Sequence, residues 1–565
     1  MKKLVGLIIL CLIATALYAV PPMPGSHTTH DGSQLPEINP VPFKSPSKHA
    51  ANSSLQKSSP LSPAAIENRN ILVILVNFND PNQRFSFLGA GATDEDYRNY
   101  YLNLLQNNTY SMRKYYQDMS GGKLNLTFTV IGPYTLDHDK AHYGTNEIKS
   151  DGTDLDTLTG DIAWEAVDKA ITNDPLTFSA ENLSKWDYDN DNQIDTFFVI
   201  HAGLGEEEGF DPNDIYSVRW YIYTAYCNGR ATHEYKEHDG KIFNSYTIQP
   251  EYIFSSKEGA LGTFCHEYGH TLGLADLYDT TFETNGVGNW SLMGGGSWGS
   301  GKSADPVPLL AWEKYFIGWL TPELITTTAE PQTFYFSDIE KSRKAWMIDL
   351  NPSGSQYLIL EGKKKNWTGT GWAVLEDGLL ITYINEDILI DNWSINTLNN
   401  TKTKAHSIDV VEAASPYYAT TGLGNLWNNP FTDSGKVCFR NNTKSILVPS
   451  YPMAAAGIGL FVSLLLLHRK RKKFGTFLLI CCLACIIACD DGGETSSSGS
   501  GDDNGGIVIP GGDTGFHYVK GQDIPNTNYY TSELVTSKTG ISGIIIMVDC
   551  PAGSSSGSFT VYKEE

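Results

Sequence analysis

Apolar residues in the first half of the chain are grouped in runs whose spacing separates strands from helices. Residues 71–78 form a continuous β-branched and aliphatic run, which predicts a buried strand. Residues 97–119 carry apolar and aromatic positions three and four apart, which predicts one helix that ends at Ser120-Gly121-Gly122. An alternating strand over 124–131 is expected to follow.

The same spacing continues to about residue 326. It predicts a helix over 161–171 and a strand over 196–200, and residues 254–275 give the strongest helical pattern of the chain. Ser255 and Glu258 have capping-box spacing and predict the start of that helix. Strands and helices in mixed succession predict an α/β (α+β) domain over residues 68–326.

From residue 327 to 448 the pattern changes to short apolar runs separated by Gly, Asn, Ser and Lys. The runs 332–336, 356–361 and 378–383 predict a β-rich module that packs on the first domain or follows it as a separate unit. Residues 515–565 predict a small β-rich tail of unknown role, with a strand at 544–548.

The N-terminus has the pattern of an exported protein. Residues 1–19 combine a basic start with a short apolar run, which predicts a signal peptide. Residues 20–67 are rich in Pro, Ser, Asn and His without apolar periodicity, and are interpreted as a pro-segment or linker.

Two apolar runs, 453–467 and 474–489, flank a basic block and predict a membrane hairpin near the C-terminus. Cys489 after Ile-Ile-Ala gives a second interpretation, a lipoprotein-like cleavage site, which usually belongs at an N-terminus. A fusion junction is a third. Residues 490–514 are a Gly, Ser and Asp linker.

Composition narrows the class of protein. Among 565 residues, 41% are hydrophobic and the formal net charge is -23, so the chain can bury a core but does not favour a nucleic-acid partner. Between the signal peptide and residue 450 lie only Cys227, Cys265 and Cys438, too few for a disulfide framework. Cys265 is expected to be a buried thiol rather than a metal ligand.

The sequence His-Glu-Tyr-Gly-His at 266–270 falls within the strongest helical pattern. Histidines four residues apart share one helix face, so His266 and His270 can bind one zinc ion. Glu267 is then placed to take a proton from a metal-activated water. This pattern indicates zinc-dependent hydrolysis of peptide bonds.

The residues that follow provide a third ligand. Gly273 tolerates positive φ and can end the helix, so that Asp276 arrives where the third zinc ligand is needed. Asp279, Glu283 and Glu313 remain alternatives for that ligand. Met293, in a glycine-rich turn, is expected to form an apolar floor beneath the metal.

Residues 266–279, the Met293 turn and residues 311–319 resemble the immune inhibitor A family of secreted bacterial metallopeptidases. Residues 71–80, 115–123, 186–208 and 378–414 resemble it too, and the likeness spans about 68–435. It implies a metzincin-like zinc endopeptidase made as a preproprotein, a zymogen, and acting on proteins or peptides. It also implies His266, His270 and Asp276 as ligands, Glu267 as base and Met293 as turn methionine. The chain departs from most metzincins in having an aspartate as third ligand and no tyrosine shortly after the methionine.

A second cation site is suggested by side-chain oxygens at alternate positions from 187 to 195. Calcium is the cation that such a loop suits. The five residues involved are Asp187, Asp189, Asp191, Gln193 and Asp195. Asn192 replaces the usual turn glycine and Phe198 the bidentate glutamate of an EF-hand, so a plain Asx-rich turn is the alternative.

The residues together predict an exported zinc-dependent endopeptidase at the cell surface or outside the cell. A catalytically silent zinc- or calcium-binding cell-surface protein is the alternative. It would keep the metal ligands, but it would not need Glu267.

Overall fold

The computed structural model describes residues 66–148, 154–206, 211, 213–252, 260–279, 286–299, 303–366, 372–374, 376–393, 396–399, 407–411, 435–440, 507–508, 516–520, 527–532, 544–549 and 555–563. The segments predicted as signal peptide, most of the pro-segment, the two apolar runs at 453–489 and most of the linker lie outside these residues. Among the described residues no helix has both the length and the apolar character needed to cross a bilayer.

The N-terminal domain is built on a five-stranded sheet in the order β2-β1-β6-β10-β7. β1 (Glu67–Asn77) is parallel to β2 (Leu124–Thr135) and β6 (Phe197–His201), and β10 (Ser245–Pro250) is parallel to β6. Only β7 (Val218–Tyr221), at one edge, is antiparallel. β1 is an interior strand and is buried along seven consecutive residues because both faces of the sheet are covered, which explains its unbroken apolar run.

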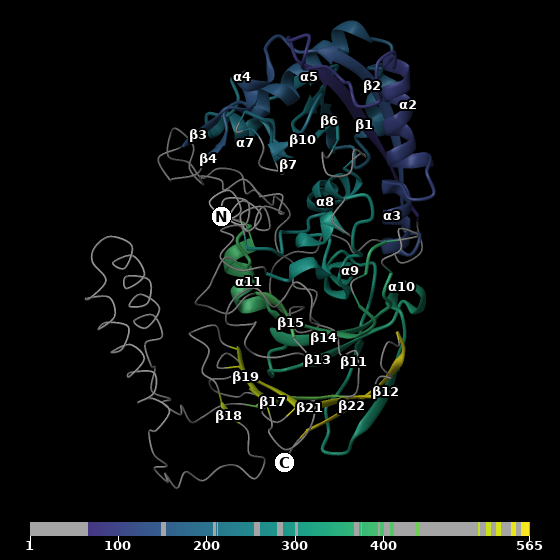
Figure 1. Ribbon diagram of the computed structural model, residues 1–565, viewed down its shortest axis with the longest axis vertical. Helices are drawn as coiled ribbons and strands as arrows, with labels where there is room; N and C mark the ends of the chain where they lie inside the picture. Colours follow the sequence, from purple (N-terminus) through teal and green to yellow (C-terminus); the bar gives the residue numbers. More distant parts are fainter. Residues whose placement is uncertain are drawn as a thin grey trace, which may run out of the picture.

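Helices cover the two faces of this sheet (Figure 1). α5 (Thr159–Asn173) packs on one face with α6 (Ala180–Trp186), in a core that contains Leu72 and Ile74. α2 (Asp94–Leu102), α3 (Met112–Ser120) and α8 (Leu261–Thr271) pack on the other face, in a core that contains Val73 and Leu75. Shorter elements around them are η2 (Asn103–Asn107), α4 (Lys140–Gly144), β3 (Asn146–Ile148), β4 (Asp154–Asp156), β5 (Gln193–Ile194), α7 (Ile222–Cys227), β8 (Lys236–His238), β9 (Lys241–Phe243), η4 (Gly288–Trp290), η5 (Gly295–Trp298) and α9 (Ala311–Phe316).

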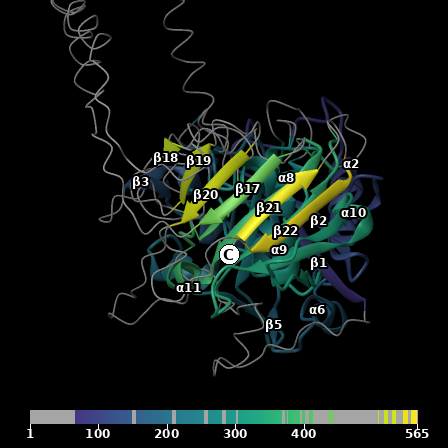
Figure 2. The same cartoon turned by 90° about the horizontal axis from the view of Figure 1, so that it is seen from below.

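The β-rich part consists of two stacked sheets. The first has the order β11-β13-β14-β15-β16, and the second has the order β12-β22-β21-β17-β20-β19-β18. Their bounds are β11 (Glu323–Leu324), β12 (Gln332–Phe336), β13 (Ala345–Asp349), β14 (Gln356–Lys363), β15 (Gly378–Asn385), β16 (Ile408–Val410), β17 (Gly435–Arg440), β18 (Ile507–Val508), β19 (Phe516–Lys520), β20 (Thr527–Ser532), β21 (Ile544–Asp549) and β22 (Gly557–Lys563), with α10 (Ile339–Ser342) and α11 (Glu386–Trp393) beside them. The strands of the second sheet are seen from below in Figure 2.

The first of these sheets lies between two cores. Tyr357 and Ile359 on β14 belong to the same core as α8, whereas Leu358 and Leu360 on the same strand pack with Phe559 of the second sheet. Alternate residues of a strand point to opposite faces, so β14 joins the N-terminal domain to the second sheet. The β-rich part is therefore packed directly on the N-terminal domain.

Most predicted elements are confirmed, although their ends differ. The strands predicted at 71–78, 124–131, 196–200, 332–336, 356–361, 378–383 and 544–548 correspond to β1, β2, β6, β12, β14, β15 and β21, and the helix predicted at 161–171 is α5. β21 and β22 join the sheet of the β-rich part, with β22 between β12 and β21, so these strands of the tail belong to that sheet.

Two helix predictions are wrong in detail. The helix expected over 97–119 is two helices, because Ser111 caps α3 by accepting a hydrogen bond of 3.3 Å from the Lys114 amide after a π-helical turn. The helix expected from 254 begins only at Leu261, behind Ala260, so the capping box at Ser255 does not open it. Ser303 caps the first turn of α8 through tertiary contacts. Its backbone carbonyl accepts a hydrogen bond from the Gly262 amide at 2.6 Å, and its hydroxyl accepts one from the Thr263 amide at 3.1 Å.

Candidate metal centre and active site

α8 carries the two histidines and is held tightly against the turn that follows Met293. A Cβ on Gly262 would lie 1.8 Å from the Ser297 carbonyl oxygen, so only glycine permits this approach. The rings of His266 and His270 lie on one face, with centroids 4.9 Å apart and planes at 88°. The four-residue spacing thus places both imidazoles at one point, as expected.

The helix ends where the sequence predicted. Gly273 has φ +88°, and the Leu274 amide donates back to the Gly269 carbonyl at 3.1 Å, which is the pattern of a left-handed helix end. The chain then turns back and brings Asp276 to the histidines. Its Oδ1 lies 3.1 Å from His266 Nε2 and 3.5 Å from His270 Nε2.

Backbone carbonyls fix the orientation of both rings. His266 Nδ1 is 2.9 Å from the Leu292 carbonyl oxygen, and His270 Nδ1 is 2.9 Å from the Leu274 carbonyl oxygen. A carbonyl can only accept, so each Nδ1 carries a hydrogen, and Nε2 is the ring atom that lies near Asp276. Metal-binding histidines commonly donate from one ring nitrogen to a carbonyl in this way, which orients the other nitrogen.

Burial and charge act differently on the two rings. Burial alone would lower the pKa of His266, but the Asp276 carboxylate outweighs it and raises the pKa to about 9. Burial lowers the pKa of His270 to about 4, since the Asp276 charge is less effective there. Without a metal, a proton on His266 satisfies the carboxylate; a bound cation would take the place of that proton.

The donor set fits zinc. His266, His270 and Asp276 each offer one ligand atom, and these atoms lie within 4.8 Å of one another. Among the described residues, His266 Nε2 and Asp276 Oδ1 are buried and have no hydrogen-bond partner of good geometry. Two imidazole nitrogens and one carboxylate oxygen are a common ligand set of catalytic zinc sites, where a fourth position stays open.

Glu267 and Tyr278 border this cluster. Glu267 is 1% exposed and follows His266 directly on α8. Burial and then the carboxylates of Asp276 and Glu267 raise the pKa of Tyr278 well above its usual value. Glu267 is therefore a buried carboxylate directly after the candidate ligand His266, and it is the candidate general base.

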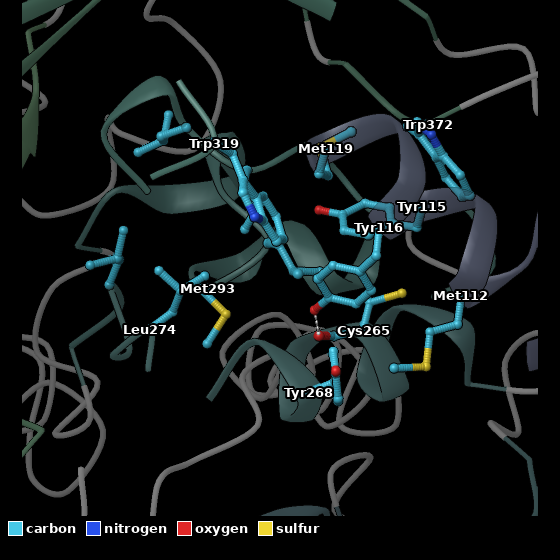
Figure 3. Close-up of a cluster of buried hydrophobic side chains, with 14 of the residues drawn as sticks. Met112, Tyr115, Tyr116, Met119, Cys265, Tyr268, Leu274, Met293, Trp319 and Trp372 are labelled. Atoms are coloured by element: carbon cyan, nitrogen blue, oxygen red, sulfur yellow. Dashed lines mark hydrogen bonds between the residues drawn. The ribbon is translucent and has the colours of Figure 1, made fainter. Parts of the chain in front are cut away.

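Met293 lies under the helix that carries the histidines (Figure 3). It is fully buried, and a Cβ on Gly269 would lie 2.6 Å from its sulfur. The glycine between Tyr268 and His270 thus lets the methionine pack against the helix. On the same helix Cys265 is fully buried, and burial raises the pKa of its thiol well above the usual value, which confirms that it is an inert core residue.

The alternatives for the third ligand separate clearly. Both oxygens of Glu313 accept from the Ser291 hydroxyl at 2.8 Å, and Oε2 also accepts from the Leu310 amide at 2.6 Å. Glu313 therefore supports the Met293 turn, whose amide donates to Ser291 at 2.9 Å. Asp279 is outside the group of converging ligand atoms among the described residues, and Glu283 lies outside the described residues.

The loop at 187–195 brings only part of its predicted set together. Ligand atoms of Asp187, Asp189 and Asp195 converge, whereas Asp191 accepts from the amide of Gln193 at 2.7 Å. Asn190 and Asn192 both have positive φ, at 62° and 71°, so asparagine takes the place of the turn glycine as expected.

Charges in this loop are partly compensated. The Lys241 ammonium contacts Asp187 and lies 3.1 Å from Asn192 Oδ1. Burial alone would raise the pKa of Asp187, but Lys241 and backbone amides lower it. Burial and the charge of Asp189 raise the pKa of Asp195 to about 7.

Sequence reasoning missed two residues of the site. Tyr278 stands two positions after Asp276 in a segment without regular secondary structure, and its closeness in sequence to Asp276 was the available signal. Asn396 accepts from the Asp276 amide at 2.8 Å and donates to Asp276 Oδ2 at 2.6 Å, although it is 120 residues away. No local pattern points to Asn396.

The cluster has two histidines one helical turn apart, a glutamate beside the first and a carboxylate as third candidate ligand. Such a cluster is suited to hydrolysis by a metal-activated water. This chemistry places the domain among the metallopeptidases. Residues 64–319 match the family described as immune inhibitor A peptidase M6, catalytic domain. This part of the chain is a catalytic domain of that family, and the family implies zinc as its metal. The match ends before the β-rich part.

Relatives agree with this assignment. The pre-pro-metalloprotease PrtV of Vibrio cholerae serotype O1 is 31% identical over 227 residues, which cover 37% of this chain and 24% of that protein. Immune inhibitor A of Bacillus thuringiensis subsp. alesti is 31% identical over 213 residues, which cover 35% of this chain and 30% of that protein. The matched region thus spans less than a third of either relative. A crystal structure of catalytically inactive OgpA from Akkermansia muciniphila matches at 12% identity and a TM-score of 0.16, covering 57% of this chain and 91% of that one, which is too low to support an argument.

Proposed function

We propose that this protein is an exported zinc-dependent endopeptidase that hydrolyses peptide bonds in proteins. His266, His270 and Asp276 would hold the metal, and Glu267 would act as general base. The observation that carries the proposal is the convergence of three ligand atoms within 4.8 Å, with both Nδ1 atoms already engaged by carbonyls.

Zinc, when bound, supplies Lewis-acid activation of a water molecule and of the scissile carbonyl. Glu267 accepts the proton of the attacking water and delivers it to the leaving nitrogen, because its carboxylate lies beside the ligand atoms on the same helix. The Leu292 and Leu274 carbonyls hold the imidazoles in one tautomer throughout. His270, with 10% of its side chain exposed, is the ligand nearest to solvent.

Export rests on the sequence. Residues 1–19 would direct secretion, and residues 20–67 would be a pro-segment that restrains the enzyme until it is removed. The printed name of one relative, a pre-pro-metalloprotease, supports this order of segments. Membrane association through residues 453–489 stays a prediction from the apolar pattern.

Calcium at 187–195 is a second proposed cation. Three converging carboxylates and the raised pKa of Asp195 favour a cation there, because a positive charge would relieve the repulsion between Asp189 and Asp195. Lys241 already contributes one positive charge to Asp187. A calcium ion would therefore compete with this lysine, and the Asx-rich turn remains the alternative.

The test compares the full chain with Glu267→Gln and His270→Ala. The parent should bind one zinc and degrade casein, and chelation should stop the degradation. Glu267→Gln keeps the size of the side chain and should retain zinc while activity falls by about 10²–10⁴-fold. His270→Ala should lose both.

Two results would contradict the proposal. Full activity of Glu267→Gln would remove the mechanism. Zinc binding by the parent without turnover on any protein substrate, after removal of residues 20–67, would favour the catalytically silent surface protein instead.

A further inference from the structure

Asn396 belongs to the β-rich part but lies at the metal centre. It follows α11 and is 2% exposed. Its φ is 54°, a left-handed conformation that asparagine tolerates better than most residues. Its backbone N–H donates to the Trp393 carbonyl at 3.1 Å. The end of α11 therefore fixes the backbone of this residue.

The side chain of Asn396 grips Asp276 at two points. Its Oδ1 accepts from the Asp276 amide at 2.8 Å, and its Nδ2 donates to Asp276 Oδ2 at 2.6 Å. With Oδ2 occupied, the carboxylate cannot rotate freely, and Oδ1 stays directed at the two histidine Nε2 atoms, 3.1 and 3.5 Å away. The orientation of the third ligand is thus set by a residue outside the domain that carries it.

Neighbouring contacts keep Asn396 in place. Asn399 Nδ2 donates to the Leu277 carbonyl at 2.8 Å, and its Oδ1 accepts from the Ile408 amide at 3.3 Å. The rings of Phe316 and Trp393 pack 4.9 Å apart, which joins α9 to α11. The segment after α11 is therefore attached to the chain at Asp276 and Leu277 by two asparagines, Asn396 and Asn399, only one of which touches a candidate ligand.

We propose that Asn396 is a positioning residue for the zinc centre, contributed by the β-rich part, which holds Asp276 in its metal-binding orientation. The inference rests on the proposed zinc function. Groups that orient a metal ligand commonly change metal affinity by about 10–100-fold when they are removed. The β-rich part is then needed to complete the metal site, in addition to its role in packing.

The experiment measures zinc affinity of the full chain by competition with a chromophoric chelator, together with the visible spectrum of the cobalt-substituted protein. Asn396→Gly removes the side-chain amide and suits the positive φ, so it adds no backbone strain to the loss of the two hydrogen bonds. The melting temperature of each metal-free variant is measured alongside, to show that it is folded. Asn396→Asp, at pH 8, keeps the acceptor but loses the donor. Asn399→Ala is the matched control, because it removes a buried amide from the same segment without touching a ligand.

Asn396→Gly and Asn396→Asp should each weaken zinc binding by about 10–100-fold and alter the cobalt spectrum, whereas Asn399→Ala should stay within threefold of the parent. Zinc binding of Asn396→Gly within threefold of the parent would overturn the inference. Equal weakening by Asn396→Gly and Asn399→Ala would also overturn it, because that would indicate general loosening of the segment. If the parent protein binds no more zinc than the His270→Ala variant, the proposed function itself is refuted.

Discussion

The contact between Gly269 and Met293 makes a quantitative prediction. A methyl group at position 269 would lie 2.6 Å from the methionine sulfur, whereas ordinary contacts begin at 3.4 Å, so the sulfur must move by at least 3.4 − 2.6 = 0.8 Å. Met293 is fully buried, and such overpacking costs about 1–3 kcal/mol. Replacing a helical glycine by alanine returns about 1 kcal/mol. Gly269→Ala should therefore destabilise the protein by about 0–2 kcal/mol.

A double-mutant cycle separates these contributions. Met293→Ala alone leaves a cavity and should cost about 2–5 kcal/mol. With the sulfur gone, the methyl group of Gly269→Ala meets no obstacle and the gain in helix propensity is realised. The double variant should therefore lose about 1–3 kcal/mol less than the sum of the two single changes.

The assay is urea unfolding of each variant in a chelator, on a Glu267→Gln background that prevents autolysis. Gly262→Ala is the control, because its Cβ would meet the Ser297 backbone oxygen at 1.8 Å, an obstacle that shortening Met293 does not relieve. Its cycle with Met293→Ala should be additive. Additivity within about 0.5 kcal/mol in the Gly269 cycle would refute the reasoning.

Two further predictions concern the periphery of the site. The pKa of Asp195 is raised to about 7 from about 3.9 in an unfolded chain, so between these pH values the folded protein retains a proton that the unfolded chain has lost. The free energy of unfolding should therefore fall as pH rises from about 4 to 7 in calcium-free buffer. This fall should be smaller in Asp195→Asn. A slope unchanged by the substitution would contradict this account. A chain ending at Asp549 lacks β22 and the buried side chains of Phe559 and Val561. Residues 327–411 of this shortened chain should therefore be cut faster in limited proteolysis. An unchanged rate would show that β22 does not stabilise this part.

The convergence of the three candidate ligands could be predicted from sequence because its geometry is local. A four-residue spacing fixes two imidazoles on one helix face, and Gly273 determines where the chain turns. The preference for Asp276 over Asp279 and Glu313 needed the structure, since the hydrogen bonds of Glu313 to Ser291 and Leu310 depend on the tertiary fold.

Other features depended on contacts that no local pattern encodes. The first turn of α8 is closed by Ser303, so a well-spaced Ser255 and Glu258 gave the wrong start. Asn396 acts across 120 residues, and its sequence surroundings are those of an ordinary polar loop. Periodicity found the strands of the β-rich part, but it does not specify their partners, so the neighbour of β12 could not be foreseen.

The sheet order of the β-rich part constrains what the chain does between residues 440 and 507. β17 and β18 lie at the two ends of that interval, and both belong to one sheet. The intervening path must start and finish on the same side of a membrane, so if the apolar runs enter one they must cross it an even number of times, as a hairpin does. Cleavage within the interval would leave a sheet assembled from two chains, in which the C-terminal piece is held without a covalent link, by strand pairing and by the apolar contacts of residues such as Phe559.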